Sequence, residues 1–118
     1  MSLYTTHVGI VKIKPKFIDD FQALFDEKHE LIKDPNIKSV FREAAISRCL
    51  LPLKEWQHWN EKKEWIGKYK THYEDGVFTY GICFNTHGSC KRFYFDFLYD
   101  ILPYVTEQVV EKDSWMEN

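Results

Sequence analysis

Residues 65–86, WIGKYKTHYEDGVFTYGICFNT, contain the feature that decides the fold. Asp75-Gly76 stands between two runs that are rich in aromatic residues. This dipeptide favours a two-residue type I′ turn, because such a turn needs a positive φ at both central positions. A turn at this place pairs Glu74 with Val77 and predicts a β-hairpin whose register is fixed.

This register sorts the side chains of both hairpin strands onto two faces. One face carries Trp65, Gly67, Tyr69, Thr71, Tyr73, Phe78, Tyr80, Ile82, Phe84 and Thr86. The other carries Lys68, Lys70, His72, Glu74, Thr79, Gly81 and Cys83. Because antiparallel sheets commonly bury only one face, we interpret the aromatic face as the buried side of a sheet. An exposed aromatic binding platform is the alternative.

The chain before the hairpin predicts a strand followed by a helix. Residues 7–14, HVGIVKIK, place apolar groups on both faces, which suits a central, covered strand. A helix is expected from Pro15 to residue 32, and Pro35 is expected to end it by biasing Asp34 away from helical geometry. The apolar stripe of this helix consists of Phe17, Phe21, Leu24, Phe25, Leu31 and Ile32.

The segment between this helix and the hairpin has a less regular pattern. Residues 37–48, IKSVFREAAISR, fit a helix or a second strand, and we favour a strand on topological grounds. Residues 51–64 contain Trp56 and Trp59 three positions apart, which suits a short amphipathic helix or turn that crosses between strands. The pattern of residues 38–62 leaves their structure open.

The last third of the chain predicts a second helix and a final strand. After Ser89, a suitable helix cap, apolar residues recur at three- and four-residue spacing as far as residue 105. A strand pattern competes with this helix at Phe93, Phe95 and Phe97. The length of the stripe favours the helix, which Pro103 should kink or end. A final strand is expected around Val109 and Val110.

These elements predict a single-domain α+β protein over residues 1–118. Their order resembles the ferredoxin-like, split β-α-β sandwich, in which an antiparallel sheet carries two main helices on one face. Residues 1–3 have the character of a cloning leader, and residues 116–118 are expected to form a frayed end. The resemblance is to a fold pattern only and implies no function.

Composition restricts the class of protein and its compartment. The 118-residue chain is 44% hydrophobic and 29% charged, as globular proteins are. A net charge of −2 without a basic stripe makes a general nucleic-acid binder unexpected. The sequence contains no membrane-spanning apolar run and no signal peptide pattern. Cys49, Cys83 and Cys90 form no C-x-x-C motif, so we expect free thiols and a cytoplasmic location.

Cys83, His87 and Cys90 are the best metal candidate, with His72 as a fourth ligand for tetrahedral zinc. The spacing is not a standard one and Cys83 falls within a strand, so no metal is expected. The same cysteines paired with His72 or His87 give a weaker case for a nucleophile, because no oxyanion loop or orienting residue accompanies them. The separate glycines form no phosphate-binding loop, and we therefore expect no cofactor.

Carboxylates recur on both predicted helices. Asp96 and Asp100 lie one helical turn apart and have the spacing for acid-base chemistry, but we interpret them as a solvated helix face. The first helix carries Asp19, Asp20, Asp26, Glu27 and Glu30. A solvated face is again the favoured interpretation, with an acidic docking surface for a basic partner as the alternative.

Trp56, Trp59 and Trp65 are the candidates for a partner surface. They interleave with lysines, as in a groove for single-stranded nucleic acid, but neighbouring glutamates dilute the positive charge. Tryptophan is enriched at interface hot spots, so another protein is the more expected partner.

Two functional hypotheses follow. The first is a small cytoplasmic, macromolecule-binding accessory protein, immunity-type or regulatory, of bacterial or phage origin, without catalytic activity and compatible with a homodimer. The second is a small-molecule-binding protein or enzyme of ferredoxin-like fold. Its site would lie on the polar hairpin face, at Lys70, His72 and Cys83, or in a dimer cleft. Tyr69 is expected to line this site as well.

Overall fold

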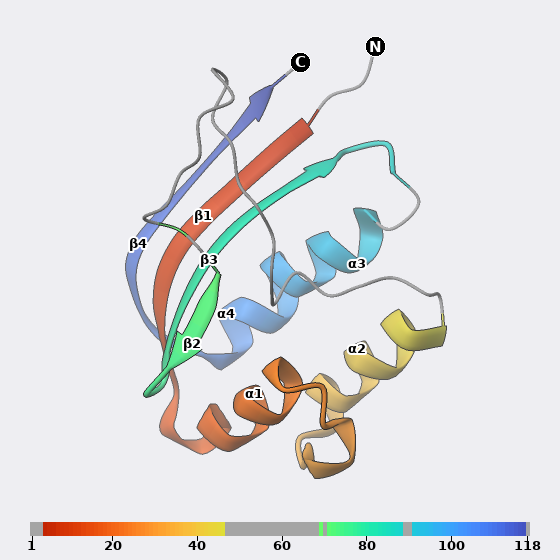
Figure 1. The fold of residues 1–118 in the computed structure, drawn as a ribbon, viewed down its shortest axis with the longest axis vertical. Helices are drawn as coiled ribbons and strands as arrows, with labels where there is room; N and C mark the ends of the chain where they lie inside the picture. Colours follow the sequence, from red (N-terminus) through yellow and green to blue (C-terminus); the bar gives the residue numbers. More distant parts are fainter. Residues whose placement is uncertain (1–3, 47–68, 70, 89–90, 118) are drawn as a thin grey trace.

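The computed structural model describes residues 4–46, 69, 71–88 and 91–117. In this part of the chain a four-stranded antiparallel sheet has the helices on one of its faces (Figure 1). The strands are β1 (Tyr4–Ile13), β2 (His72–Glu74), β3 (Val77–Asn85) and β4 (Thr106–Glu117). The helices are α1 (Ile18–Phe25), α2 (Pro35–Ile46), α3 (Lys91–Asp96) and α4 (Leu102–Val105). Shorter helical elements are the 3₁₀ turns η1 (Pro15–Phe17) and η2 (His29–Leu31) and the π segment η4 (Phe97–Ile101).

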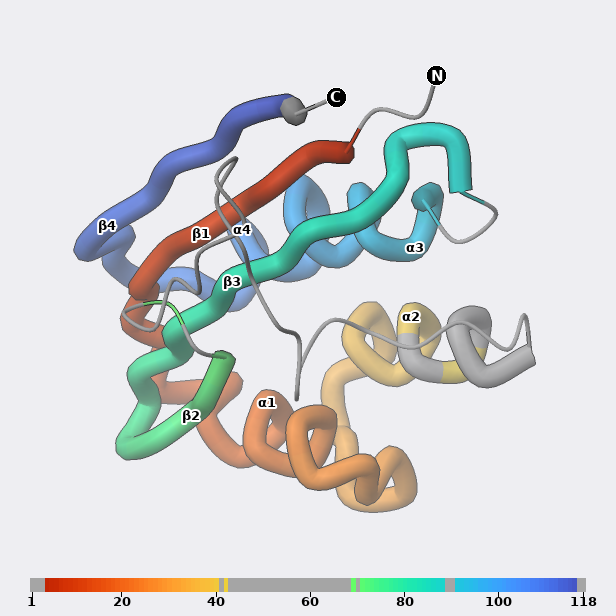
Figure 2. Tube along the Cα trace, turned by 45° about the horizontal axis from the view of Figure 1, so that its top comes forward, coloured from red at the N-terminus to blue at the C-terminus, as the bar shows by residue number. Residues whose placement is uncertain are grey.

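The strands lie in the order β2-β3-β1-β4, so β3 and β1 are central (Figure 2). Helices α1 and α2 follow β1 in sequence, and α3, η4 and α4 connect β3 to β4. The expected α+β class, with an antiparallel sheet and helices on one face, is confirmed. The order of the described elements matches the split β-α-β pattern. None of the described helices is long and apolar enough to cross a membrane.

The hairpin forms with the predicted register. Glu74 pairs with Val77, and Asp75 and Gly76 have φ values of 51° and 76°, as a type I′ turn requires. The described part of the aromatic face is largely buried, which confirms the favoured interpretation over an exposed platform. Its buried members are Thr71, Tyr73, Phe78, Tyr80, Ile82 and Phe84.

The first hairpin strand is shorter than the sequence indicates. Main-chain pairing stops at His72, and Thr71 continues it with its side chain. The N–H of Gly81 donates to Thr71 Oγ1 (3.2 Å), which in turn donates to the Gly81 carbonyl (3.4 Å). Tyr69 lies outside β2, and residues 65–68 and 70, for which further pairing is predicted, lie outside the described residues.

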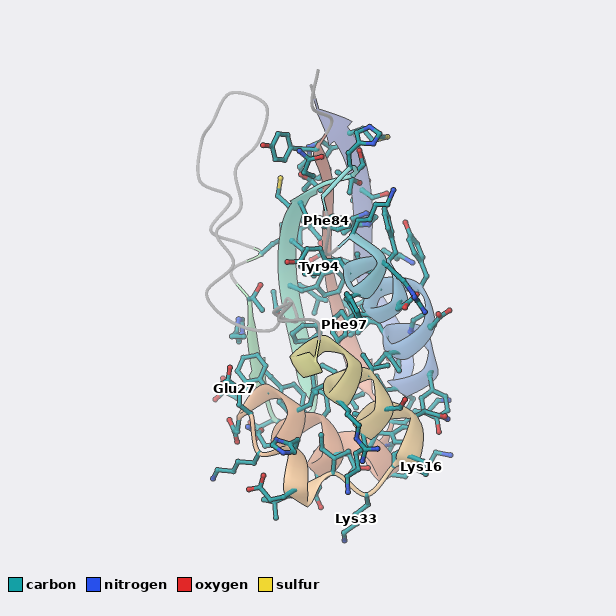
Figure 3. The ribbon with its side chains drawn as sticks, turned by 90° about the vertical axis from the view of Figure 1, so that its right-hand side faces the viewer. Lys16, Glu27, Lys33, Phe84, Tyr94 and Phe97 are labelled. Carbon is teal, nitrogen blue, oxygen red and sulfur yellow. The ribbon has the colours of Figure 1, made fainter. Side chains whose placement is uncertain are left out.

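Aromatic side chains fill the layer between the sheet and the helices. Figure 3 shows Phe84, Tyr94 and Phe97 in this layer. The ring centroids of Phe84 and Tyr94 are 4.9 Å apart, and those of Phe21 and Phe78 are 5.0 Å apart. Each such pair contributes about 0.5–1.5 kcal/mol beyond the burial of apolar area. These contacts hold α1 and α3 to the same strand, β3.

Helix α1 ends at Phe25, so the predicted continuous helix to residue 32 was wrong. Glu27 has a φ of 61°, and the N–H of Lys28 donates to the carbonyl of Ala23 (2.8 Å). This is a Schellman motif, which usually has glycine in the left-handed position. Glutamate occupies that position here, so the sequence lacks the usual stop signal. Leu31, which was expected on the apolar stripe, is consequently 58% exposed.

The strand favoured for residues 37–48 was also wrong, because the described part of this segment belongs to helix α2. Asp34 caps the helix: its Oδ2 accepts hydrogen bonds from the N–H groups of Asn36 and Ile37, each at 3.1 Å. Pro35 is the first helical residue, where its fixed φ is favourable. The proline therefore begins a new helix after the first one has already ended.

The helix predicted after Ser89 is confirmed and spans Lys91 to Val105 in three parts. In its π segment the N–H of Leu102 donates to the carbonyl of Phe97, five residues back. The helix ends two residues after Pro103, and β4 follows directly. The predicted last strand is thus confirmed, and it pairs with β1 as far as Glu117.

Candidate ligand-binding pocket

An open pocket lies between the last helix and strands β1, β3 and β4, on the helix-covered face of the sheet. Its volume is about 230 Å³. The lining is mainly apolar with a small number of polar groups. The lining residues are Val11, Tyr80, Leu98, Leu102, Pro103, Thr106, Glu107, Val109 and Lys112.

A β-bulge in β4 places Val109 at this pocket. Ile10 is opposite Glu111, but Val11 is opposite Val109, so Val110 is an extra residue in β4. An unbroken ladder would instead place Val110 opposite Val11. The two valines are exposed to a similar degree, 52% and 48%, but only Val109 lines the pocket.

The helical wall of the pocket comes from η4 and α4. Leu98 and Leu102 are each 4% exposed, and Pro103 follows them at the exposed end of the wall. Segments of π-helix are rare and often occur at functional sites. The wall of this pocket therefore combines an irregular helix with an irregular strand.

The aromatic ring of Tyr80 lies over Gly9 of β1. A Cβ atom at Gly9 would lie 2.5 Å from the Tyr80 hydroxyl oxygen, so the absence of a side chain at Gly9 makes room for the ring. Tyr80 is 1% exposed. Burial, with a smaller contribution from Tyr99, raises the pKa of Tyr80 to about 12. The phenol therefore stays protonated at neutral pH and presents a hydrogen-bond donor.

His7, which the sequence did not single out, lies in β1 two residues before Gly9 and so close to Tyr80. It is 6% exposed, and its Nε2 is 3.0 Å from Thr5 Oγ1. The rings of Phe84 and Tyr99 lie near it, with centroids at 6.0 and 5.8 Å. Burial and, secondarily, the charge of Lys112 lower the pKa of His7. Its imidazole is therefore neutral at pH 7.

Two of the residues predicted for a site on the polar hairpin face, His72 and Cys83, lie apart from each other. His72 is exposed opposite Thr79, whereas Cys83 is half-buried further along β3. Four positions of strand separate Thr79 from Cys83, or roughly 13 Å. Lys70 lies outside the described residues, and this site stays a prediction.

The predicted metal ligands are described only in part. His87 is exposed in the turn after β3, where its N–H donates to Asn85 Oδ1 (2.8 Å). Cys90 lies outside the described residues. Among the residues that the structure does describe, no three metal-ligating side chains form a cluster. The nucleophile hypothesis likewise stays a prediction.

The carboxylates of the last helix lie toward solvent. Asp100 is exposed, and Asp96 Oδ2 lies 3.8 Å from Arg92 Nε, one helical turn away. This arrangement agrees with a solvated helix face. An exposed ion pair of this kind contributes about 0.5 kcal/mol or less.

Asp20 does not belong to the solvated acidic face that the sequence suggested for the first helix. It is 6% exposed, and its two carboxylate oxygens accept hydrogen bonds from the N–H groups of Lys33 and Asp34, each at 2.9 Å. Asp20 therefore ties α1 to the start of α2. The other acidic residues of this region are exposed, namely Asp19, Asp26, Glu27 and Glu30.

Trp56, Trp59 and Trp65 lie outside the described residues, and the predicted partner surface therefore stays a prediction. The pocket at the last helix was missed by the sequence reasoning. One signal for it was present: Gly9 lies in the middle of a predicted strand, and an isolated glycine there indicates close approach by another group. In this fold the approaching group is the Tyr80 ring.

No protein-family model matches the chain, and neither curated proteins nor solved structures gave a match. A functional proposal for this protein therefore rests on the chemistry of its own residues.

Proposed function

We propose that the protein binds a small, mainly apolar molecule in the pocket between the last helix and β4. The composition of the lining supports this proposal. Ligand sites commonly combine a preformed apolar cavity with a few polar groups that orient the ligand. Tyr80 and Lys112 are such polar groups. The apolar groups beside them are Val11, Leu98, Leu102, Pro103 and Val109.

The dimensions of the pocket set the size of the ligand and its affinity. Its volume of about 230 Å³ is below the range of roughly 300–1,000 Å³ that is usual for drug-sized ligands. Burying about 150–200 Å² of apolar ligand surface at about 25 cal/mol per Å² contributes about 4–5 kcal/mol. Because binding also costs translational and rotational freedom, apolar contact alone gives dissociation constants of about 1 mM or weaker.

Two neighbouring valines provide a sharp test of this proposal. Val109→Trp fills the pocket mouth, whereas Val110→Trp adds the same side chain to an equally exposed position that does not line the pocket. We expect small alcohols, amides and carboxylic acids to shift the amide resonances of pocket residues in ¹H–¹⁵N spectra. These shifts should saturate in the wild type and in Val110→Trp and disappear in Val109→Trp.

Two outcomes contradict the proposal. One is a panel in which no compound shifts the pocket amides of the wild type. The other is binding that persists unchanged in Val109→Trp, since the ligand would then occupy another part of the molecule.

Macromolecule binding through Trp56, Trp59 and Trp65 is the second candidate function. The exposed carboxylates around η2 favour it, because they offer charge complementarity to a basic partner. Capture of one protein in constant stoichiometry by the wild type, and its loss with Trp56→Ala/Trp59→Ala, would support it.

A further inference from the structure

We infer that the ligand of this pocket carries an anionic group, such as a carboxylate, which binds at the end formed by Lys112 and Tyr80. This inference rests on the proposed function and specifies the class of ligand. It follows from the positions of the charges and hydrogen-bond donors around the pocket.

Lys112 supplies the positive charge at one end of the pocket. It is opposite Gly9 in the ladder, on the face that carries the helices, and its charge acts on His7. The adjacent acidic residues, Glu111 and Asp113, point to the other face of the sheet because side chains alternate along a strand. None of the ion pairs among the described residues uses Lys112.

Tyr80 supplies a hydrogen-bond donor beside this charge. Its ring crosses Gly9, the residue that pairs with Lys112, so its hydroxyl is directed toward the same end of the pocket. No group in the described part of the chain hydrogen-bonds this hydroxyl. A protonated phenol and an ammonium group together offer donors to one acceptor, and a carboxylate accepts such bonds strongly.

The negative charge of the lining is at the opposite end. Lys112 is opposite Gly9, whereas Gln108 and Thr106, the neighbours of Glu107, are opposite Lys12 and Ile13. Three to four positions of β1 separate these places, or roughly 10–13 Å. Val109, opposite Val11 of β1, lies between the two charged residues along β4, and both valines line the pocket. A ligand with an apolar body and one terminal anion fits this order when its anion points toward Lys112.

Octanoate and octanol are matched probes, because they share an apolar chain and differ in the anionic group. We expect wild-type protein to bind octanoate about tenfold more tightly than octanol, as a charge-assisted hydrogen bond implies. Binding is measured from saturating shifts of the pocket amides in ¹H–¹⁵N spectra. Lys112→Gln should weaken octanoate binding about tenfold more than it weakens octanol binding, so that the preference for octanoate is lost.

Two further variants make the assignment specific. Lys12→Gln removes an exposed lysine from β1, at a position opposite Gln108, and should keep the full preference for octanoate. Tyr80→Phe keeps the ring and removes the hydroxyl, so it should weaken octanoate binding more than octanol binding.

The outcomes separate this inference from the proposed function. Equal affinity of the wild type for octanoate and octanol overturns the inference and leaves the pocket as a binding site. A preference that survives Lys112→Gln also overturns it. Absence of binding for both probes at the pocket amides overturns the inference together with the proposed function.

Discussion

Gly9→Ala tests the contact on which the pocket geometry depends. The new Cβ would lie 2.5 Å from the hydroxyl oxygen of Tyr80 and 2.6 and 2.8 Å from two atoms of its ring. Ordinary contact begins at 3.4 Å, so the hydroxyl end of the Tyr80 side chain must shift by about 0.9 Å relative to the backbone of Gly9. Tyr80 is 1% exposed and stacks on Phe78 with centroids 5.4 Å apart. A shift of this size therefore displaces tightly packed neighbours.

Two effects of opposite sign decide the outcome of Gly9→Ala. Replacing glycine by alanine stabilises a compatible site by about 0.4–1 kcal/mol, because the unfolded chain loses freedom. Overpacking a well-packed core costs about 1–3 kcal/mol. Because the cost of overpacking is larger than the gain from the unfolded chain, we expect the free energy of unfolding to fall by about 1–2 kcal/mol. For a domain of this size the melting temperature should fall by about 4–8 °C.

Urea and thermal unfolding followed by circular dichroism measure this loss. Gly88→Ala is the matched control, because a Cβ there would lie 3.2 Å from the Asn85 carbonyl oxygen and 3.8 Å from Asn85 Cβ, outside the sheet. Its effect should stay within about 0.5 kcal/mol. In a double-mutant cycle, Tyr80→Leu should lower the free energy of unfolding less in the Gly9→Ala protein than in the wild type, because it removes the clashing ring. A Gly9→Ala protein as stable as the wild type would refute the reasoning.

Two further predictions concern buried polar groups. Asp20→Asn replaces one of two acceptors by a donor that faces a main-chain N–H, so the free energy of unfolding should fall by about 1–3 kcal/mol. Asp19→Asn, at an exposed neighbour, should change this free energy by less than about 0.5 kcal/mol. Equal effects of the two substitutions in urea unfolding would contradict the role assigned to Asp20. The lowered pKa of His7 means that, as pH falls below about 6.5, the unfolded chain takes up a proton that the folded protein resists, so stability declines by at most about 1.4 kcal/mol per pH unit. The free energy of unfolding of the wild type, minus that of His7→Gln, should therefore decrease from pH 7 to pH 5. If the two free energies change in parallel with pH, His7 does not titrate in this way.

The hairpin shows which structural features local sequence predicts well. Asp75 and Gly76 are adjacent residues that together favour a turn with positive φ values, and the two flanking strands alternate with a period of two. Turn, register and buried face follow from these neighbours alone, and all three are confirmed. The last helix was predicted correctly for a similar reason, since its apolar stripe continues past the competing strand pattern.

The errors arose where a less usual residue carried out a familiar role. Glu27 occupies the left-handed position at the end of α1, where glycine is the usual signal. Asp20 looks like one more acidic residue of a solvated face, but its carboxylate reaches the N–H of Lys33, thirteen residues away. Helix α2 has a pattern that also fits a strand, and the cap supplied by Asp34 identifies it only once the backbone is in place.

The sequence by itself determined the α+β class, the hairpin and the buried aromatic face, because periodicity and turn conformation depend on neighbouring residues. Only the tertiary structure decided which residues surround the pocket. Val11, Tyr80, Leu98 and Lys112 come from β1, β3, η4 and β4, and long-range strand pairing brings them together. A one-residue bulge then selects Val109 rather than Val110 for the pocket, because the pairing with β1 sets which side chain faces the helices.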